Sequence, residues 1–385
     1  MKKTIATLVL AAAAALSASA AFDDTFRVRV ASYNIRTSTG WQDTGDKAWD
    51  SRKSALCNLV KSIAPDVIGF QEVETAQMED LKALLPDYEI FGKHRETDNT
   101  KLATPVAYRK SRFLLLDGGT FWLSTTPNVQ GSKALSDGYT GTDPETCSWA
   151  LLKDRTSGGV FCFFCTHLDW KQAECRKRQM AIAVQRVMLF VDQSVPAVIV
   201  GDMNSQETES SIAEVAYSEL KDACLVSSTT PTGPWRTFND WTYKTADDEP
   251  SCQDALQLPI ADRNPLNDGK RVDYVLTSPD VSVDSFAIRN DAQPGKEQYP
   301  SDHYPIVADL AMSCDNAIFA GKVRVEIDKT IPSVGYGRYV LTQGANLLND
   351  DNLEFVLPRW VQRAAVEDGE IVIYTKPDPF KIHLR

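Results

Sequence analysis

Basic residues are outnumbered in this chain, and histidine is scarce. The 385 residues include 41 Lys and Arg against 52 Asp and Glu, and only four His, which gives a net charge of −11 and a pI near 5.0. So acidic a chain is not expected to wrap nucleic acid or to coat a membrane surface. A nuclease is not excluded, because a local basic patch or bound cations can offset the overall field. The acidic balance also suits a protein that collects divalent cations.

Long apolar runs are missing too, apart from a short one near the N-terminus. Lys2 and Lys3 precede a mostly apolar stretch, Thr4–Leu16, which is too short to span a bilayer. Ala18-Ser-Ala20 has the pattern of a cleavage site, so residues 1–20 are predicted to be a signal peptide. No Cys follows the site, so no stable membrane anchor is expected. We therefore predict a periplasmic or secreted protein with a cleaved Sec-type signal.

Eight cysteines do not make a disulfide scaffold here. Their spacing is irregular and the chain is large; an oxidising compartment would permit disulfides, and their pairing stays open. Cys162-Phe-Phe-Cys165 has the C-x-x-C spacing of redox and zinc sites. It lies in a strand-like apolar run, Val160–Cys165, in which positions i and i+3 face opposite sides. Two buried thiols are therefore favoured over a redox or zinc site.

Strand-like and helix-like segments are mixed along residues 22–314. Apolar runs and alternation predict strands at 27–35, 67–71, 88–91, 105–109, 113–116, 121–124, 149–153, 160–166, 197–200, 272–276, 285–288 and 306–312. Helical periodicity predicts helices at 48–63, from 75 onward, at 174–192 and near 210–220. This order, with several hairpins, favours a layered α/β sandwich over a purely parallel doubly wound sheet.

Two further regions differ in character from this pattern. Residues 225–268 are rich in Thr, Pro, Asp and aromatics without a clear period, which predicts a long loop region of the kind that often carries function. Short strand-like segments among Gly, Pro and Asn follow from residue 316. Residues 316–385 are therefore predicted to form a small β-rich C-terminal domain.

The stretch Ala197-Val-Ile-Val-Gly-Asp-Met-Asn-Ser205 is the most informative in the chain. An apolar run typical of a buried strand ends at Gly201, and Asp202 and Asn204 follow one residue apart. In an extended segment, residues i and i+2 point the same way, so both side chains are expected to converge on one ion, water or phosphate. Ligands commonly bind just past the carboxyl ends of such strands.

The same pattern, an apolar run next to polar or charged residues, recurs along the chain. A chance polar turn is therefore a poor explanation of it. Six apolar segments lie beside residues able to bind metal or transfer protons: Asn34, Glu72, His167 with Asp169, Asp202 with Asn204, Asp273, and Asp302 with His303. Two of the four His residues fall in these clusters. Together they indicate one catalytic site.

Oxygen ligands dominate these clusters, and several common catalytic motifs are absent. Carboxylates and amides suit Mg²⁺ or Mn²⁺ rather than zinc, and Mg²⁺ is typical of phosphate chemistry. No nucleophile elbow, Walker A loop or Rossmann glycine pattern occurs. The pattern therefore indicates phosphoester hydrolysis by direct, metal-assisted attack of water.

At these residues the sequence resembles the endonuclease/exonuclease/phosphatase superfamily. The motifs SYN(34)IR, FQE(72)V, TH(167)LD(169), GD(202)MN(204)S, D(273)YVL and SD(302)H(303)YP occur in the order typical of that family, over about residues 26–312. The stretches RKSALCNLV, GTFWLSTTP and SDHYPIVADL are most similar to an exported bacterial branch. The resemblance implies a four-layer α/β/β/α sandwich.

The resemblance also implies a role for each site residue. Glu72 is expected to be the main metal ligand, with Asn34 and Asp302 completing that site. Asp202 and Asn204 would position or activate the water, or hold a second ion. His303, oriented by Asp273, would stabilise the transition state. The remaining implied roles are phosphate binding or leaving-group assistance for His167, and support of its loop or contact with substrate for Asp169.

Substrate contacts beyond the phosphate are less well defined. Leu102–Pro105 and Glu145 stand where this branch is expected to carry an acidic or small polar pair and a basic residue. Arg36, Arg95 and Lys171 are candidate phosphate contacts, with solvated surface charge as the alternative. Aromatics of the long loop could stack on a sugar or base, or simply pack the loop: Trp235, Phe238 and Trp241.

Several functions remain open at this point. We favour a monomeric, exported, Mg²⁺-dependent phosphatase or phosphodiesterase acting on small organic phosphates such as sugar phosphates. A secreted nuclease acting on DNA or RNA would use the same site, and a sphingomyelinase-like phospholipase is a further alternative. A binding module with an inactive site is disfavoured by the complete ligand set. The number of metal ions is left open.

Overall fold

The computed structural model describes most of the chain. It covers residues 25–98, 101–192, 194–244, 249–263 and 270–314, and the strand segments 323–326, 338–340, 353–356, 361–367 and 370–375. The predicted signal peptide, residues 1–20, lies outside the described residues. The predicted division near residue 315 also lies at a gap, so the domain boundaries stay a prediction.

The first sheet unites the beginning and the end of the described 25–314 region. Its strand order is β11-β12-β1-β2-β4-β3, with β1 parallel to β2 and antiparallel to β12. Its strands are β1 (Thr25–Asn34), β2 (Val67–Gln71), β3 (Tyr88–Phe91), β4 (Val106–Arg109), β11 (Ser282–Ile288) and β12 (Ile306–Ser313). The predicted strands of this sheet are confirmed.

The second sheet is formed by the middle of the chain. Its order is β5-β6-β7-β8-β10-β9, and only β7 and β8 are parallel neighbours. Its strands are β5 (Phe113–Trp122), β6 (Thr146–Asp154), β7 (Val160–His167), β8 (Ala197–Asp202), β9 (Lys221–Asp222) and β10 (Asp273–Thr277).

The prediction of two separate strands at 113–116 and 121–124 was wrong. A single strand, β5, runs through Asp117-Gly-Gly119, with a β-bulge between Leu115 and Asp117. These turn-forming residues pair with β6 across the sheet, because a bulge absorbs an extra residue without breaking the ladder.

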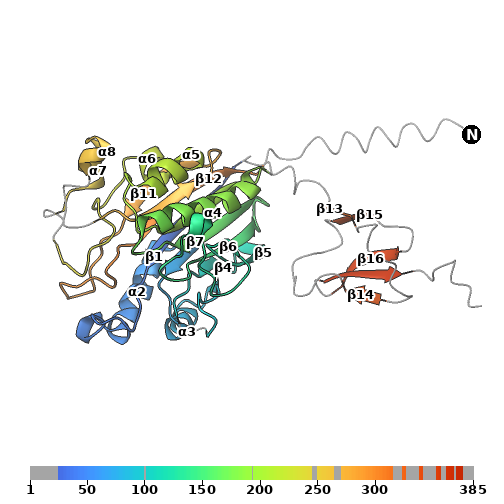
Figure 1. Ribbon diagram of the computed structural model, residues 1–385, viewed down its shortest axis with the longest axis horizontal. Helices are drawn as coiled ribbons and strands as arrows, with labels where there is room; N and C mark the ends of the chain where they lie inside the picture. The colour runs from blue at the N-terminus through green and yellow to red at the C-terminus, as the bar shows by residue number, and fades with distance from the viewer. Residues whose placement is uncertain are drawn as a thin grey trace, which may run out of the picture.

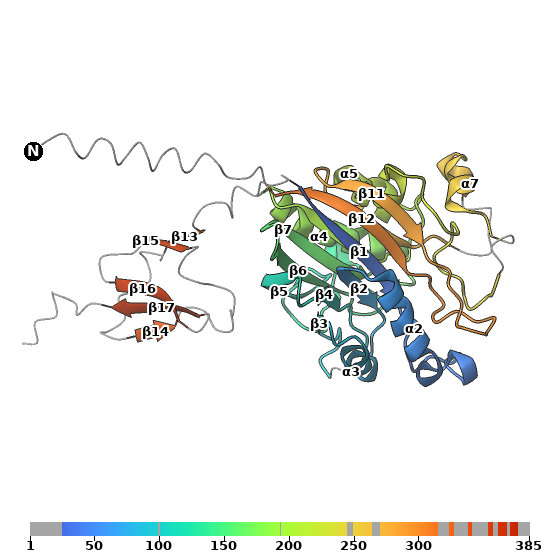
Figure 2. The same cartoon turned by 180° about the vertical axis from the view of Figure 1, so that it is seen from behind.

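Helices cover the two outer faces of the paired sheets, which gives four layers. α2 (Trp49–Ile63) and α3 (Thr75–Leu84) pack on the first sheet, and α4 (Ala173–Val191) packs on the second, with the π-helical turn η3 (Ser211–Ala216) beside it. Figures 1 and 2 show the sheets from opposite sides, with α4 nearer the viewer in Figure 1 and α2 in Figure 2. The predicted α/β/β/α sandwich is confirmed.

Alternation along the strands supplies both the central core and the outer cores. In β7, Phe161, Phe163 and Cys165 pack between the sheets, whereas Cys162 and Phe164 pack under the helices. The C-x-x-C pair therefore faces opposite sides, as predicted, and all eight cysteines are free thiols. Cys162 and Cys165 are both fully buried, and because they lie on opposite faces of β7 they do not form one site.

The remaining elements are short. The helix predicted near 210–220 is η3 followed by a single turn, α5 (Tyr217–Glu219). The predicted long loop carries three short helices: α6 (Ala223–Val226), α7 (Cys252–Leu256) and α8 (Ile260–Arg263). Five C-terminal strands pair in two small groups: β13 (Val323–Glu326) with β15 (Leu353–Val356), and β14 (Arg338–Val340) with β17 (Glu370–Thr375) and β16 (Val361–Glu367). Among the described residues, no helix is both long and apolar enough to cross a bilayer.

Candidate active site

The predicted site residues converge in one cleft between the edges of the two sheets. β1 and β2 bring Asn34 and Glu72, while β7 and β8 bring His167 and Asp202. The cleft has a volume of about 500 Å³. Residues predicted for the site that line it are Arg36, Glu72, Arg95, His167, Asp202, Asn204, Asp302 and His303. Residues from 36 to 303 thus form a single site.

Asp202 lies at the centre of this cleft. Its Oδ2 accepts a hydrogen bond from Asn34 Nδ2 at 3.0 Å, and lies 3.6 Å from His167 Nε2 and 3.5 Å from His303 Nε2. Its Oδ1 accepts the Asn204 backbone N–H at 2.8 Å. Burial raises the pKa of the Asp202 carboxyl, Asp273 adds to the rise, and the two histidines oppose it.

Gly201 allows β7 and β8 to approach each other closely. It is paired with Thr166 across β7 and β8, and a Cβ at Gly201 would lie 2.0 Å from the Thr166 carbonyl oxygen. Only glycine therefore fits this register. The next residues in each strand, His167 and Asp202, are consequently paired neighbours.

Asn204 reaches the cleft by a different path from the one predicted. The segment is not extended there, since Asn204 has a left-handed backbone with φ of 47°. Its Nδ2 donates to the Leu168 carbonyl at 2.9 Å and lies 3.2 Å from His167 Nε2. Asp202 and Asn204 therefore converge through a turn that the side chain of Asp202 itself closes.

Each active-site histidine is held by a buried carboxylate. His303 Nδ1 lies 2.8 Å from Asp273 Oδ2, and His167 Nδ1 lies 3.3 Å from Glu145 Oε2. Burial alone would lower both pKa values, but Asp273 helps raise that of His303 to about 10, and Glu145 that of His167 to about 9. Both rings are therefore cations at neutral pH, and each directs Nε2 toward Asp202.

Glu145 is a site residue that the sequence did not reveal. It stands where a basic residue was expected, and only the pairing of β6 with β7 brings it beside His167. Arg95, which lines the cleft and whose contact with phosphate stays a prediction, binds Glu145 Oε1 at 2.9 Å through Nη1 and Asp143 at 3.4 Å through Nη2. The sequence signal that could have revealed this residue was an acidic side chain directly before β6, the strand that precedes β7.

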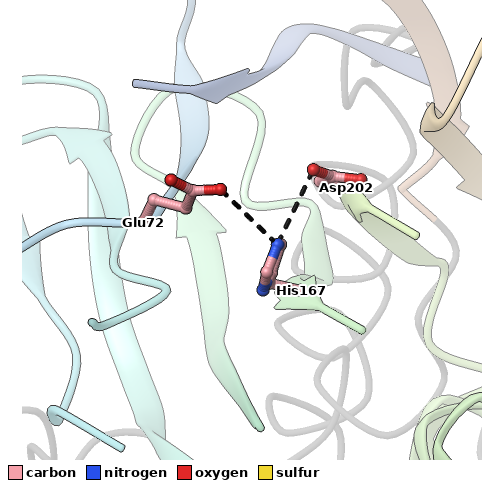
Figure 3. Close-up of side chains that lie close together, drawn as sticks. All are labelled: Glu72, His167 and Asp202. Carbon is pink, nitrogen blue, oxygen red and sulfur yellow. Dashed lines mark ion pairs between the residues drawn. The ribbon is translucent and has the colours of Figure 1, made fainter. Parts of the chain in front are cut away.

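Glu72 and Asp302 form the other half of the site. Glu72 has a left-handed backbone (φ 61°), and its carboxylate accepts from Asn34 Nδ2 at 3.1 Å and from the Thr37 N–H at 3.1 Å. Figure 3 shows the His167 ring turned toward both Glu72 and Asp202. Its Nε2 lies 3.9 Å from Glu72 Oε1. Burial would raise the pKa of Glu72, yet His167 and Arg36 lower it to about 2. Burial raises the pKa of Asp302 to about 6, although Arg36 Nη1 lies 3.5 Å from its Oδ2.

These carboxylates fit a divalent cation. Carboxylate oxygens of Glu72 and Asp202 lie within 4.8 Å of each other, as do those of Asp202 and Asp273. Asp273 Oδ1 is buried and has no hydrogen-bond partner within the described part of the chain. Buried acid oxygens are costly unless a cation or donor compensates them, and hard oxygen donors suit a hard ion.

Asn34 occupies a different position in this geometry from the one expected of a ligand. Its Nδ2 bridges the carboxylates of Glu72 and Asp202, and its Oδ1 accepts the Arg36 backbone N–H at 3.0 Å. Asn34 thus holds two acids in place. Its direct coordination of metal through Oδ1 would require the amide to turn, and stays a prediction.

Other predicted contacts divide into supporting and cleft-lining residues. The buried Asp169 carboxylate accepts hydrogen bonds from Thr142 and from the backbone N–H groups of Lys171 and Gln172, so it supports the loop after β7. Trp235 and Trp241 are buried and pack the long loop. Phe238 alone of the three loop aromatics lines the cleft, with its ring centroid 5.0 Å from that of His303. Lys171 also lines the cleft.

Known proteins are similar to this chain in sequence and fold. An endonuclease/exonuclease/phosphatase family protein from Bacteroides thetaiotaomicron is 25% identical, with a TM-score of 0.64, and the match covers 75% of this chain and 96% of that one. A mannosyl-6-phosphatase from the same organism is 26% identical, with a TM-score of 0.62 and coverage of 74% and 99%. An uncharacterized protein of Acanthamoeba polyphaga mimivirus is 28% identical over 165 residues, which is 34% of this chain and only 23% of that relative.

The model of one protein family matches most of the chain. This is the Endonuclease/Exonuclease/phosphatase family, which matches residues 31–303 and so includes every residue of the cleft discussed above. Its enzymes use divalent metals, in agreement with the acid-rich cluster around Asp202. The chain belongs to the Endonuclease/Exonuclease/phosphatase family and is a metal-dependent phosphoester hydrolase.

Proposed function

We propose that this protein is an exported, Mg²⁺-dependent phosphatase or phosphodiesterase for small organic phosphates such as sugar phosphates. The observation that carries the proposal is the pair of histidinium–carboxylate dyads, His303–Asp273 and His167–Glu145, that point at one carboxylate, Asp202. Export rests on the signal-like residues 1–20, and Mg²⁺ on the oxygen-rich ligand set.

Asp202 is the base in this mechanism. It accepts a proton from the attacking water, while the N–H of Asn204 and the amide of Asn34 hold the carboxylate in place. His303 donates from Nε2 to a phosphate oxygen as negative charge builds up, and Asp273 stabilises the imidazolium. His167 is placed to donate to the leaving oxygen. Mg²⁺, held by Glu72 and Asp302, would polarise the phosphoryl group.

The charge of the cleft favours a small ester over a polymer. Two of its arginines are already paired with acids of the cleft: Arg95 with Asp143 and Arg176 with Glu209. These two pairs leave Lys171 and Lys270 as the exposed basic side chains of the cleft, which are few for a polyanionic backbone, whose affinity depends on such charge. The likeness to a mannosyl-6-phosphatase supports a sugar phosphate in this cleft.

A nuclease is the second candidate. Lys171 and Lys270 are both exposed at the cleft, where they could contact phosphates on either side of a scissile bond. This function predicts cleavage of plasmid DNA or RNA that weakens steeply as salt is raised.

A panel of substrates separates these functions. Purified protein is incubated with Mg²⁺ and mannose 6-phosphate, glycerol 3-phosphate, inositol phosphates, AMP, phospholipid, plasmid DNA or RNA, with EDTA and Asp202→Asn as blanks. We expect EDTA-sensitive phosphate release from small esters, reduced about 10²- to 10⁴-fold by Asp202→Asn. Cleavage of nucleic acid without release from any small ester would reject the proposal.

A further inference from the structure

We propose that Trp170 and Asp143 form a subsite for the sugar ring of a phosphorylated pyranose. This inference rests on the proposed function and specifies the part of the substrate that the catalytic residues do not contact. Neither residue has a role in phosphate chemistry, yet both line the same cleft as His167 and Asp202.

Trp170 is a large apolar side chain held in an exposed position. It is 59% exposed, whereas Trp235 and Trp241 are buried. Its indole Nε1 lies 3.3 Å from Asp143 Oδ2, and Lys171 Nζ lies 5.8 Å from its ring centroid. An exposed indole at a cleft gains from covering a ligand, because burial of its apolar face is favourable.

The backbone beside Trp170 is fixed as well. The preceding residue, Asp169, is buried and receives hydrogen bonds from Thr142, Lys171 and Gln172. The ring is therefore fixed at its N–H edge and at its backbone before any ligand binds. Such preorganisation lowers the entropic cost of binding.

Asp143 adds a polar contact to this apolar face. Its Oδ2 accepts a hydrogen bond from Trp170 Nε1 and forms an ion pair with Arg95. Its Oδ1 has no hydrogen bond to any described residue, and the side chain is 33% exposed. A free carboxylate oxygen can accept hydrogen bonds from sugar hydroxyls, while the C–H face of a pyranose covers the indole. An aromatic face and a carboxylate side by side therefore match a carbohydrate.

The acidic side chains on this wall of the cleft disfavour the binding of a nucleic acid strand. Asp143 and Glu209 pair with Arg95 and Arg176 on the cleft wall, so these arginines offer little attraction to the neighbouring phosphates of a polynucleotide. A single phosphomonoester has no such neighbours. The structure therefore assigns this wall to a neutral ring that carries one phosphate.

The first test is substrate selectivity. The ratio of kcat/KM for mannose 6-phosphate to that for glycerol 3-phosphate is measured in Trp170→Ala, Trp170→Phe and Asp143→Asn. We expect Trp170→Ala to lower this ratio roughly 10- to 100-fold, the range that a single apolar contact gives to specificity, and Trp170→Phe to restore most of it. Trp41→Ala is the matched control, because Trp41 is 85% exposed and does not line the cleft. An unchanged ratio in Trp170→Ala, or a selective loss with AMP instead, would overturn the subsite.

A binding measurement keeps the subsite testable if the proposed function fails. Calorimetry with Mg²⁺ and the Asp202→Asn protein compares mannose 6-phosphate with inorganic phosphate. The subsite predicts at least about tenfold tighter binding of the sugar phosphate, which Trp170→Ala abolishes. Equal affinities for the two ligands would reject the subsite. Absence of any hydrolysis by the wild-type protein, with the affinity difference present, would reject the proposed function alone.

Discussion

Glu145 determines which nitrogen of His167 faces the cleft. A carboxylate beside Nδ1 accepts the proton of that nitrogen in a hydrogen bond, so the Nε2–H of the imidazolium faces the cleft and can donate. Arg95 in turn holds the other oxygen of Glu145, at 2.9 Å. The chain Arg95–Glu145–His167 therefore positions a proton donor without touching the substrate itself.

We predict that Glu145→Gln lowers kcat by about 10²-fold with little change in KM, because the reaction loses an oriented imidazolium while the cleft keeps its shape. Steady-state kinetics on a small phosphoester measures both constants. Glu145→Asp, which keeps the charge, is expected to recover part of kcat. Glu89→Gln, on the exposed side of β3, is the control. An equal rise of KM in Glu145→Gln would indicate a general distortion of the cleft instead.

The sequence predicted most catalytic residues because each follows or precedes an apolar run. Glu145 could not be found in this way, since its partner is set by the register of β6 against β7 and lies 22 positions away. The same limit applies to Arg95, whose long side chain reaches Glu145 across 50 positions. Pairing across a sheet is a tertiary property, which local periodicity does not contain.

At the scale of elements, the β7–β8 pair governs the geometry of the reaction. It places His167 opposite Asp202, and it requires that nothing larger than hydrogen stand at Gly201. The strands are parallel and buried on both faces, so they cannot bulge outward to relieve a clash.

We predict that Gly201→Ala destabilises the protein by about 1–3 kcal/mol and also reduces kcat, because the new methyl group pushes Thr166 away from the strand pair. Urea unfolding followed by circular dichroism gives the first value, and phosphate release gives the second. Gly119→Ala is a matched control, since a Cβ there would meet only Trp149 Nε1 at 3.6 Å. Wild-type stability in Gly201→Ala would contradict the close packing described.

The turn between β6 and β7 depends on Asp154. Its carboxylate accepts the N–H groups of Thr156 and Ser157 at 2.8 and 2.9 Å and binds Arg112 Nε at 2.8 Å. Burial would raise the pKa of Asp154, but these donors lower it below its usual value. The carboxylate therefore adds stability above its unfolded pKa of about 4, and this contribution is lost as the pH falls through the folded pKa.

We predict that Asp154→Asn costs about 1–2 kcal/mol of unfolding free energy at pH 7, and that its difference from wild type shrinks toward pH 3. Denaturant unfolding at several pH values measures this difference. Asp87→Asn, at an exposed position, is expected to show no such trend. A difference independent of pH would show that the charge of Asp154 is not what holds the turn.

Element boundaries followed from the sequence where the hydrophobic period was clean, as in α2, α4 and β8. The sequence did not predict the boundaries of elements in which local conformational preference and tertiary pairing disagree. Asp117-Gly-Gly119 has turn composition but pairs within β5, and the segment before Tyr217 winds as a π-helix where ordinary helical periodicity was expected. Both cases show packing overriding intrinsic preference.

At the scale of the whole molecule, metal binding and stability are linked. An ion held by Glu72 and Asp302 would bind only the folded chain, and it would favour the charged form of Asp302, whose pKa burial raises. Glu72 follows β2 and Asp302 precedes β12, so the ion would link two segments of the first sheet.

We predict that Mg²⁺ raises the Tm of the wild-type protein and that EDTA removes both this gain and activity. At 100 times the Kd the stabilisation is about 2.7 kcal/mol. Differential scanning calorimetry with and without Mg²⁺ measures it. Glu72→Gln should show a much smaller shift, while Glu89→Gln should behave as wild type. A shift in Glu72→Gln equal to that of wild type would place the ion elsewhere.

The pairing of β1 with β12 has a consequence for the order of synthesis. β1 opens the described region and carries Asn34 to the cleft, whereas Asp302 and His303 come just before β12, more than 260 residues later. A nascent chain that ends before residue 302 lacks β12, one of the two strands that flank β1, and also lacks both of these site residues. We therefore expect activity toward phosphoesters to begin only after the last strand of the first sheet has paired with β1.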